Sequence, residues 1–260
     1  MRREKSLVTI ITVTYNSSKY LERCFKSVFS QTYTNIEYIV IDGGSTDGTV
    51  DLIKQYESKI KYWISEPDKG IYEAMNKGLK EANGKIIHFL NSDDYFCDNN
   101  VVRDVVRSFN ENPEVDLIYG YVIKLIDELN MKFETRCSVN RKNLIKPRSL
   151  PQQAFFYKKE IFERLGDFDI SYKGSGDYEY LCRMYTNGVK MKEIDRSIVY
   201  FKKGGISSKV SEGHRSLKKY FGLKYAIWFY IKSRVKLFVI FLLRKLGLLK
   251  YIHKIKYKKK

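Results

Sequence analysis

Two adjacent carboxylates, Asp93 and Asp94, lie at the carboxyl end of an apolar stretch, Lys85 to Leu90, that has the composition of a buried strand. Like charges held side by side where a strand meets solvent raise each other's pKa unless a cation lies between them. The pair therefore indicates a metal site, with an ordinary polar turn as the alternative.

The elements that would position this pair alternate between strands and helices. β-branched, nearly continuous apolar segments are typical of parallel strands that are covered on both faces. Four strand and helix units in the first 95 residues or so indicate an α/β fold of Rossmann-like type, with a mixed sheet flanked by helices. The expected strands are Leu7–Thr14, Ile36–Ile41, Tyr62–Ser65 and Lys85–Leu90.

Polar residues follow each of these strands. In such sheets ligands bind at the carboxyl ends of the strands, so the clusters are expected to line one crevice. Asp42 has the wrong charge to hold a bare phosphate, and it is better suited to accept hydrogen bonds from a base or a ribose. The clusters are Tyr15-Asn16, Asp42, Glu66-Pro67-Asp68 and Asp93-Asp94.

Further along the chain the pattern is less regular. Val101 to Asn110 is expected to be a helix and Val115 to Tyr121 a strand, whereas Ile123 to Asn143 is either a hairpin or a variable insertion. Asp177 opens another helical segment, where a carboxylate usually acts as a helix cap.

The charge of the chain is concentrated in its C-terminal part. The 260 residues carry a formal charge of +18, but residues 202–260 hold 18 Lys and Arg against one acid, Glu212. The remaining residues carry +1, so the folded part lacks the basic face that nucleic-acid binding requires. We therefore expect a catalytic domain over 1–215 and a basic helical tail over 216–260.

The tail is rich in aromatic residues as well as in Lys and Arg. Its longest charge-free runs, YAIWFYI and LFVIFLL, have seven residues each, whereas spanning a bilayer takes about 20. A helix lying in the plane of an anionic membrane surface fits this composition best. A helix docked on its own domain or at a dimer interface is the alternative.

The cysteines and the N-terminal residues favour a cytoplasmic protein, and the basic tail would make it peripheral on the inner face of the cell membrane. The four cysteines are widely spaced and form no CxxC pair, which is typical of reduced interior thiols. The short, alternating apolar segment near the start lacks the pattern of a secretory signal.

Five segments of the chain carry a recognisable pattern: TIITVTYN, IVIDGGSTDGT, SEPDKGIYEAMNKG, FLNSDD and GDFDISYKGSGDYEYLCR. Together they resemble the family 2 glycosyltransferases of the GT-A fold, particularly the bacterial members that build capsule, exopolysaccharide and related surface glycans. The resemblance covers roughly residues 7–185, in the order and spacing of that family.

The resemblance implies a nucleotide-sugar site, with Asp42 accepting from the base. The DxD-type signature of the family falls on Asn91-Ser92-Asp93, where many relatives have Asp in place of Asn91. It makes Asp93 the first choice and Asp94 the second as ligand of Mg²⁺ or Mn²⁺. The residues assigned to the nucleotide sugar are Thr14, Tyr15, Asn16, Asp42, Asp68, Asn76, Asn91, Asp93 and Gln153.

The resemblance also implies that Asp177 is the general base, with Glu179 as its local competitor. Relatives often carry His-Gln where this chain has Gln152-Gln153. The implied reaction is an inverting transfer from a nucleotide-diphosphate sugar, with a UDP-sugar favoured, to a hydroxyl of a glycan or a lipid-linked sugar. Basic residues that could reach the donor diphosphate are Lys202, Lys203, His214 and Arg215.

Three other functions remain open from the sequence. A polybasic protein without catalysis would bind membrane or nucleic acid through the tail. A nucleotidyltransferase would share the sheet and the metal, but it normally shows an early Gly-rich phosphate loop with a basic residue, which this chain lacks. A degenerate transferase serving as a scaffold is favoured slightly by Asn91 and Gln152.

Overall fold

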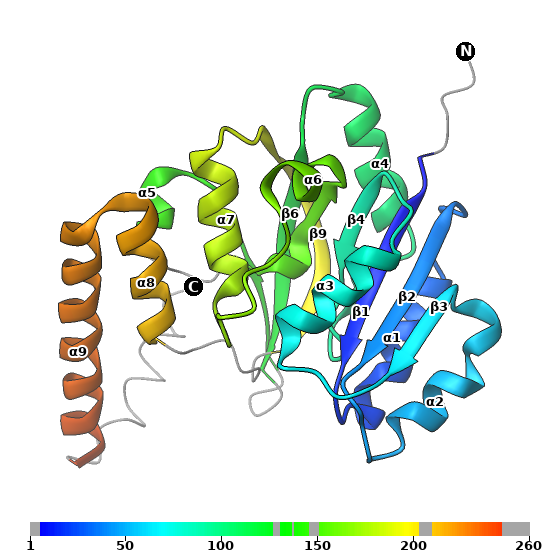
Figure 1. Ribbon diagram of the computed structural model, residues 1–260, viewed down its shortest axis with the longest axis horizontal. Coiled ribbons are helices and arrows are strands. Elements are labelled where there is room, and N and C mark those ends of the chain that lie inside the picture. The colour runs from blue at the N-terminus through cyan, green and yellow to red at the C-terminus, as the bar shows by residue number, and fades with distance from the viewer. Residues whose placement is uncertain (1–5, 127–130, 137, 146–150, 203–209, 246–260) are drawn as a thin grey trace. The chain divides into compact units, whose positions relative to one another are not determined.

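The computed structural model describes residues 6–126, 131–136, 138–145, 151–202 and 210–245 (Figure 1). The chain divides into two units, Met1–Ser208 and Lys209–Lys260. The first unit contains one mixed sheet with helices around it, which is the predicted fold class.

The first half of the sheet is parallel, as the apolar segments predict. β1 lies between β2 and β4, and β3 pairs with the outer edge of β2. All seven residues of β1 are buried, because helices cover both faces of a parallel sheet. These strands are β1 (Val8–Thr14), β2 (Ile36–Asp42), β3 (Tyr62–Ser65) and β4 (Ile86–Phe89).

The second half of the sheet is mixed and is built from strands farther along the chain. The strand order is β3-β2-β1-β4-β8-β6-β9-β5, with β7 paired to β6. β6 and β7 are antiparallel neighbours, as the hairpin alternative for Ile123 to Asn143 predicts. These strands are β5 (Tyr95–Phe96), β6 (Leu117–Ile126), β7 (Met131–Thr135), β8 (Phe155–Lys158) and β9 (Met191–Lys202).

Helices connect the strands and cover the sheet. α3 crosses in front of β1 and β2 in Figure 1, and Gly78 lets it approach closely, because a Cβ there would collide with Ile11. Ser17 occupies the N-cap position of α1, but its side chain forms no capping hydrogen bond. The helices are α1 (Ser18–Phe29), α2 (Thr49–Gln55), α3 (Ile71–Glu81), α4 (Val101–Glu111), α5 (Arg141–Leu144), α6 (Glu160–Leu165) and α7 (Gly176–Thr186).

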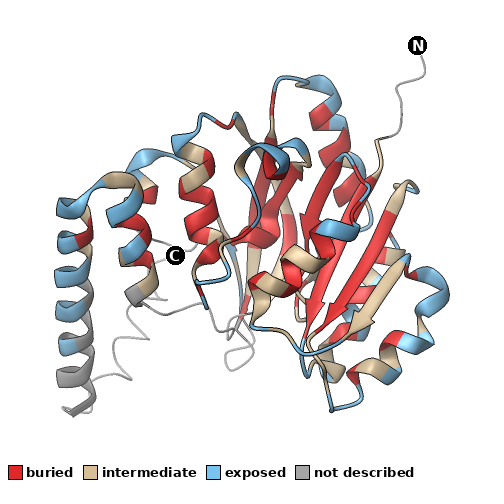
Figure 2. Ribbon diagram, viewed as in Figure 1, coloured by how far each residue is buried: buried red, intermediate tan, exposed pale blue. Residues whose placement is uncertain are grey.

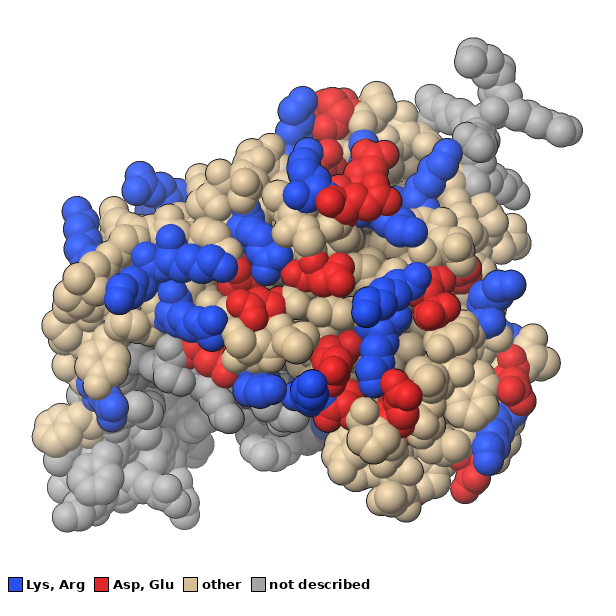
Figure 3. Space-filling model, viewed as in Figure 1, with Lys and Arg blue, Asp and Glu red and all other residues tan. Residues whose placement is uncertain are grey.

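The core lies in the central strands, which are buried along most of their length (Figure 2). Acidic and basic side chains are interspersed over the face of the first unit in Figure 3, as its formal charge near zero implies. Cys24 and Cys182 are buried and unpaired, as expected, and Cys97 is half-buried, whereas Cys137 lies outside the described residues.

The described part of the second unit contains two helices, α8 (Val210–Phe221) and α9 (Leu223–Lys245), with Gly222 between them at a φ of 97°. Leu217 of α8 and Ala226 of α9 are fully buried, and the two helices pack against each other. No helix within residues 6–245 that the structure describes is long and apolar enough to cross a membrane. Lys250 and Lys254 lie outside the described residues.

A neutral histidine is part of the core. His88 on β4 is fully buried, and its ring stacks on Phe156 at 4.0 Å between centroids. Its Nδ1 lies 3.0 Å from the carbonyl oxygen of Phe155, while Nε2 has no hydrogen-bond partner. Burial lowers the pKa of His88 from 6.5 to about 4, because the imidazolium would lose its hydration.

This burial makes folding stability depend on pH. Between pH 4 and 6.5 the unfolded chain binds a proton at His88 that the folded chain does not, so acidification through this window destabilises the wild type. The effect is about 3 kcal/mol when complete. His88→Phe should lack this component. In urea unfolding, the free energy of unfolding of the wild type should therefore rise relative to that of the variant as pH rises from 4 to 6.5. Parallel pH curves would show that His88 does not titrate in this way.

Candidate active site

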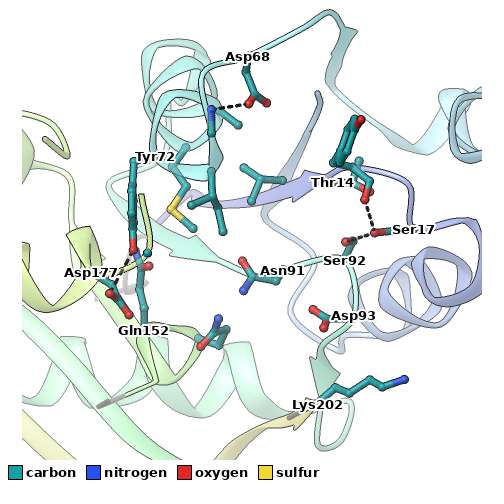
Figure 4. Close-up of a pocket in the computed structure, with 18 of the residues that line it drawn as sticks. Thr14, Ser17, Asp68, Tyr72, Asn91, Ser92, Asp93, Gln152, Asp177 and Lys202 are labelled. Atoms are coloured by element: carbon teal, nitrogen blue, oxygen red, sulfur yellow. Dashed lines mark hydrogen bonds between the residues drawn. The ribbon is translucent and has the colours of Figure 1, made fainter. Parts of the chain in front are cut away.

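A pocket of about 410 Å³ opens at the carboxyl ends of β1, β3 and β4 and reaches α7 (Figure 4). This volume lies within the range of small-molecule sites. The predicted crevice is therefore present, although the end of β2 does not contribute to its wall. Predicted site residues that line it are Thr14, Tyr15, Asn16, Asp68, Asn91, Asp93, Gln153 and Asp177.

The turn after β1 forms one side of the pocket. Asn16 adopts a left-handed φ of 47°, and its side-chain oxygen accepts from the backbone of Thr46 at 3.0 Å. Its own backbone N–H donates to Ser45 at 2.7 Å, so the turn is tied to the glycine-rich loop after β2. Tyr15 is 64% exposed, which leaves the face of an aromatic ring available at the mouth of the pocket.

Asp42 shapes the neighbouring loop and does not line the pocket. It is fully buried, and Oδ2 accepts from the backbone of Gly44 at 3.1 Å, the backbone of Ser45 at 2.8 Å and the hydroxyl of Ser65 at 2.6 Å. The N–H groups of its own tight turn and the hydroxyls of Ser45 and Ser65 surround the carboxylate. The expected contact of Asp42 with a base stays a prediction.

Asp68 and Asn76 also differ in where they lie. Asp68 lines the pocket, and its Oδ1 accepts from the backbone of Gly70 at 2.7 Å. Asn76 on α3 instead forms two hydrogen bonds with the backbone of Phe168, at 2.9 and 3.1 Å. Asn76 thus joins α3 to the segment before α7, and its assignment to the donor side stays a prediction.

The carboxyl end of β4 supplies the acidic part of the pocket. Asp93 and Asn91 line it, whereas Asp94 is 1% exposed and lies behind the lining. Oδ1 of Asp94 accepts from the backbone N–H of Lys202 at 3.1 Å, but among the residues that the structure describes Oδ2 has no partner, and neither has the buried Oδ1 of Asn91. This short segment therefore combines two buried oxygen atoms without a donor, on Asn91 and Asp94, with the carboxylate of Asp93 at the wall of the cavity.

The electrostatics of this segment favour a cation. Burial raises the pKa of Asp93, and burial together with the charge of Asp93 raises the pKa of Asp94. Lys202 and Arg23 oppose these shifts only in part. A divalent cation would stabilise both ionised carboxylates, and carboxylate oxygens are the ligands that Mg²⁺ and Mn²⁺ prefer.

The residues present fit a metal that is shared with a substrate. The described residues contain no group of three or more His, Cys, Asp or Glu side chains that could hold a metal ion by themselves. Mg²⁺ commonly binds through one or two carboxylates, with water and substrate phosphates completing the shell. Asp93 is placed to be such a ligand from the wall of the pocket, and the orphaned oxygen of Asp94 lies next to it in sequence.

Asp177 lies across the pocket from this acidic segment (Figure 4). It is the second residue of α7, and its Oδ1 accepts from the hydroxyl of Tyr72 at 3.2 Å and from the backbone of Tyr178 at 2.8 Å. Glu179, the local competitor, is fully buried, pairs with Arg183 and does not line the pocket. The geometry therefore favours Asp177 as the carboxylate that can meet a ligand.

Two glutamines complete the wall beside Asp177. Gln152 and Gln153 are both buried and both line the pocket, and Nε2 of Gln152, near the Tyr157 hydroxyl, forms no hydrogen bond of ordinary geometry with any described residue. Lys202 lines the pocket as expected, and its ammonium lies 3.8 Å from the centre of the Tyr20 ring. Lys203 is outside the described residues, and His214 and Arg215 belong to the second unit.

Tyr72 is a site residue that the sequence did not single out. It lines the pocket and contacts Asp177, which is 105 residues away in the chain. Its position four residues before Asn76 places both side chains on one face of α3. That spacing within the GIYEAMNKG segment was the available signal.

The comparisons with known proteins show the family of the chain. The family model described as "Glycosyl transferase family 2" matches residues 9–166, a range that includes Asp93 and ends before Asp177. An uncharacterized glycosyltransferase of Mycobacterium tuberculosis is 34% identical over 177 residues, which are 68% of each chain. A PGL/p-HBAD biosynthesis glycosyltransferase of Mycobacterium bovis is 28% identical over 209 residues, covering 78% of this chain and 80% of the relative.

Solved structures share the fold. TarS of S. aureus in complex with UDP-GlcNAc has a TM-score of 0.66 at 18% identity, covering 82% of this chain and 65% of that one. A mannosyltransferase from Pyrobaculum calidifontis in complex with GDP-Man and Mn²⁺ has a TM-score of 0.60 at 18% identity, covering 83% and 61%. The chain thus spans less than two thirds of either structural neighbour. Its sheet is the GT-A fold, and the chain belongs to glycosyl transferase family 2.

Proposed function

We propose that this glycosyltransferase is inverting and metal-dependent, and that it transfers a sugar from a nucleotide-diphosphate sugar to a hydroxyl group. The observation that carries the proposal is the pocket with Asp93 on one wall and Asp177 on the opposite wall (Figure 4). A direct displacement requires a site that holds the leaving group and a group that accepts a proton. Asp93 would serve the leaving group, and Asp177 would accept the proton.

The donor would lie between the turn after β1 and the end of β4. The exposed ring of Tyr15 offers a stacking surface to a base, and Lys202 offers a positive charge to a diphosphate. TarS and the mannosyltransferase are described with UDP-GlcNAc and GDP-Man, which supports a nucleotide sugar here. Among these donors we favour a UDP-sugar.

Asp93, with Asp94 as the second candidate, would hold Mg²⁺ or Mn²⁺. When bound, the metal would supply Lewis-acid stabilisation of the diphosphate charge that develops as the donor breaks. The mannosyltransferase neighbour is described with Mn²⁺, which supports this choice. Lys202 would add a fixed positive charge on the same side, since its ammonium lies at the pocket wall.

Asp177 would act as the general base. It would accept the proton of the acceptor hydroxyl as that oxygen forms its bond to the anomeric carbon. The bond from the anomeric carbon to the diphosphate oxygen breaks in the same step, and the nucleoside diphosphate leaves with the electron pair. Attack from the face opposite the leaving group inverts the centre, so an α-linked donor gives a β-linkage.

We further propose that the acceptor is a glycan or a lipid-linked sugar in the biosynthesis of a bacterial surface polysaccharide such as capsule or exopolysaccharide. The name of the Mycobacterium bovis relative supports a role in building a glycosylated product. A degenerate scaffold is the alternative, and the orphaned polar atoms of Asn91 and Gln152 argue against it, because a structural site would satisfy them.

The second unit would place the enzyme on the cytoplasmic face of an anionic membrane. α9 packs on α8 through buried Ala226 but leaves a broad apolar arc exposed, interrupted by Lys224 and Arg234. α9 is apolar around most of its circumference, so it is less amphipathic than a helix that lies in the membrane plane usually is, and the proposal rests on its exposed apolar residues and on the many basic residues of the tail. The exposed apolar residues are Leu223, Ile227, Trp228, Tyr230, Ile231, Val235 and Phe238.

Asp93→Asn tests the metal assignment. We expect calorimetric binding of UDP to lose its dependence on Mn²⁺, while thermal unfolding without metal stays unchanged or improves, because burial already disfavours the charged form of Asp93. Asp51→Asn, at an exposed position on α2, is the matched control and should bind as the wild type does. If Asp94→Asn loses the dependence and Asp93→Asn keeps it, the ligand is Asp94.

Flotation with liposomes tests the membrane assignment. The full chain should float with vesicles that contain anionic lipid, and high salt should release only part of it, because apolar insertion persists when charge attraction is screened. Replacing Ile227, Ile231 and Val235 by Gln should abolish flotation in high salt. Ile170→Gln, an exposed isoleucine of the first unit, should have no effect. Wild-type protein that stays at the bottom of the gradient would exclude membrane binding.

A further inference from the structure

Tyr72 is packed against the segment that carries Asp177. Its ring is 5% exposed and lies 5.8 Å from the ring of Phe168. A Cβ on Gly176 would come within 2.8 Å of the Tyr72 ring, so only glycine fits beside it. The hydroxyl of Tyr72 then reaches Oδ1 of Asp177 at 3.2 Å (Figure 4).

The neighbouring contacts fix this arrangement from several directions. Asn76, one turn along α3, holds the backbone of Phe168 with two hydrogen bonds. Just before α3, the carbonyl of Lys69 accepts from the ammonium of Lys173 at 2.9 Å. α3 and Lys69 just before it therefore contact the segment from Phe168 to Asp177 at three points: the first residue of the segment, Lys173 in its middle, and its last residue.

We infer that Tyr72 is the positioning residue of the general base: its hydroxyl holds the Asp177 carboxylate in the orientation that faces the acceptor. The inference rests on the proposed function, in which Asp177 takes the acceptor proton. In this inference α3 carries no reacting group itself but orients the carboxylate of Asp177, which does react.

The chemistry of the contact supports a donor role for Tyr72. Burial and the charge of Asp177 both raise the pKa of Tyr72, so the phenol stays protonated and the carboxylate is the acceptor. Oδ1 receives a second hydrogen bond from the backbone of Tyr178. Oδ1 thus receives hydrogen bonds from two different helices, and removing the Tyr72 hydroxyl takes away one that comes from α3.

Other titratable groups lie near Asp177. Tyr157 of β8 lies within electrostatic reach of the carboxylate. Glu179, on the same helix, is neutralised by its pair with Arg183. Backbone groups of Gly176 and Asp177 also hydrogen-bond to the Tyr72 hydroxyl, so Tyr72→Phe removes these contacts together with the bond to the Asp177 carboxylate. The charged groups that share the pocket with Asp177 are Asp68, Asp93, Lys173 and Lys202.

The first measurement needs no substrate. In the full chain labelled with ¹³C at Asp Cγ, the Asp177 resonance is assigned by its loss in Asp177→Asn, and its pKa is read from an NMR titration. Tyr72→Phe should raise this pKa by about one unit, because a hydrogen bond to the ionised form is removed. Gly176→Ala, which displaces the Tyr72 ring without removing its hydroxyl, should raise it as well.

Tyr180→Phe is the matched control. Tyr180 is buried on the same helix, and its hydroxyl finds no hydrogen-bond partner in the described part of the chain. Removing this hydroxyl should leave the pKa of Asp177 unchanged. An equal pKa in the wild type, Tyr72→Phe and Tyr180→Phe would overturn the inference.

The second measurement is turnover, read as UDP release with Mn²⁺ from UDP-N-acetylglucosamine. Tyr72→Phe should lower kcat about tenfold, move the acid limb of the pH profile upward by about one unit, and change donor affinity less than twofold. If Asp177→Asn is inactive and Tyr72→Phe matches the wild type in all three, the inference alone fails. If Asp177→Asn retains full turnover, the proposed base is wrong even where the NMR shift is seen.

Discussion

The join between α3 and the segment from Phe168 to Asp177 is the constraint on which the site depends. The donor side is built by β1 and β4, whereas Asp177 arrives from a helix that follows much later in the chain. Nothing local in the sequence ties these two parts together. α3 does so because Gly78 lets it sit close on β1, while Tyr72 and Asn76 on its other side hold the later segment.

A second constraint is the electrostatic cost of the acidic segment after β4. Asp93 and Asp94 are both largely removed from water, and burial raises the pKa of each. The backbone N–H of Lys202 gives Asp94 one hydrogen bond and brings β9 to the same corner of the sheet. A fold that only had to be stable would replace these carboxylates, so their burial beside a pocket is best explained by function.

The sequence predicted the strands and most helices well because apolar runs and turn residues mark them directly. It also predicted the crevice, since parallel strands must end at one edge of the sheet. It did not reveal that Asp42 and Asn76 are turned into structural hydrogen bonds, because their partners, such as Ser65 and the backbone of Phe168, come together only in the fold. Tyr72 escaped notice for the same reason, as its partner Asp177 is remote in the sequence.

The central claim, that this pocket takes a nucleotide-diphosphate sugar together with a metal, is tested most directly by thermal unfolding of the wild-type chain. UDP-glucose, UDP-galactose, UDP-N-acetylglucosamine and GDP-mannose would each be added with Mn²⁺ and, separately, with EDTA. A donor at about 100 times its Kd stabilises the fold by about 2.7 kcal/mol, which is a rise in Tm of about 5 °C or more for a chain of this size. We predict such a rise for at least one UDP-sugar with Mn²⁺ and its loss in EDTA. Equal melting curves with and without every donor would contradict the account.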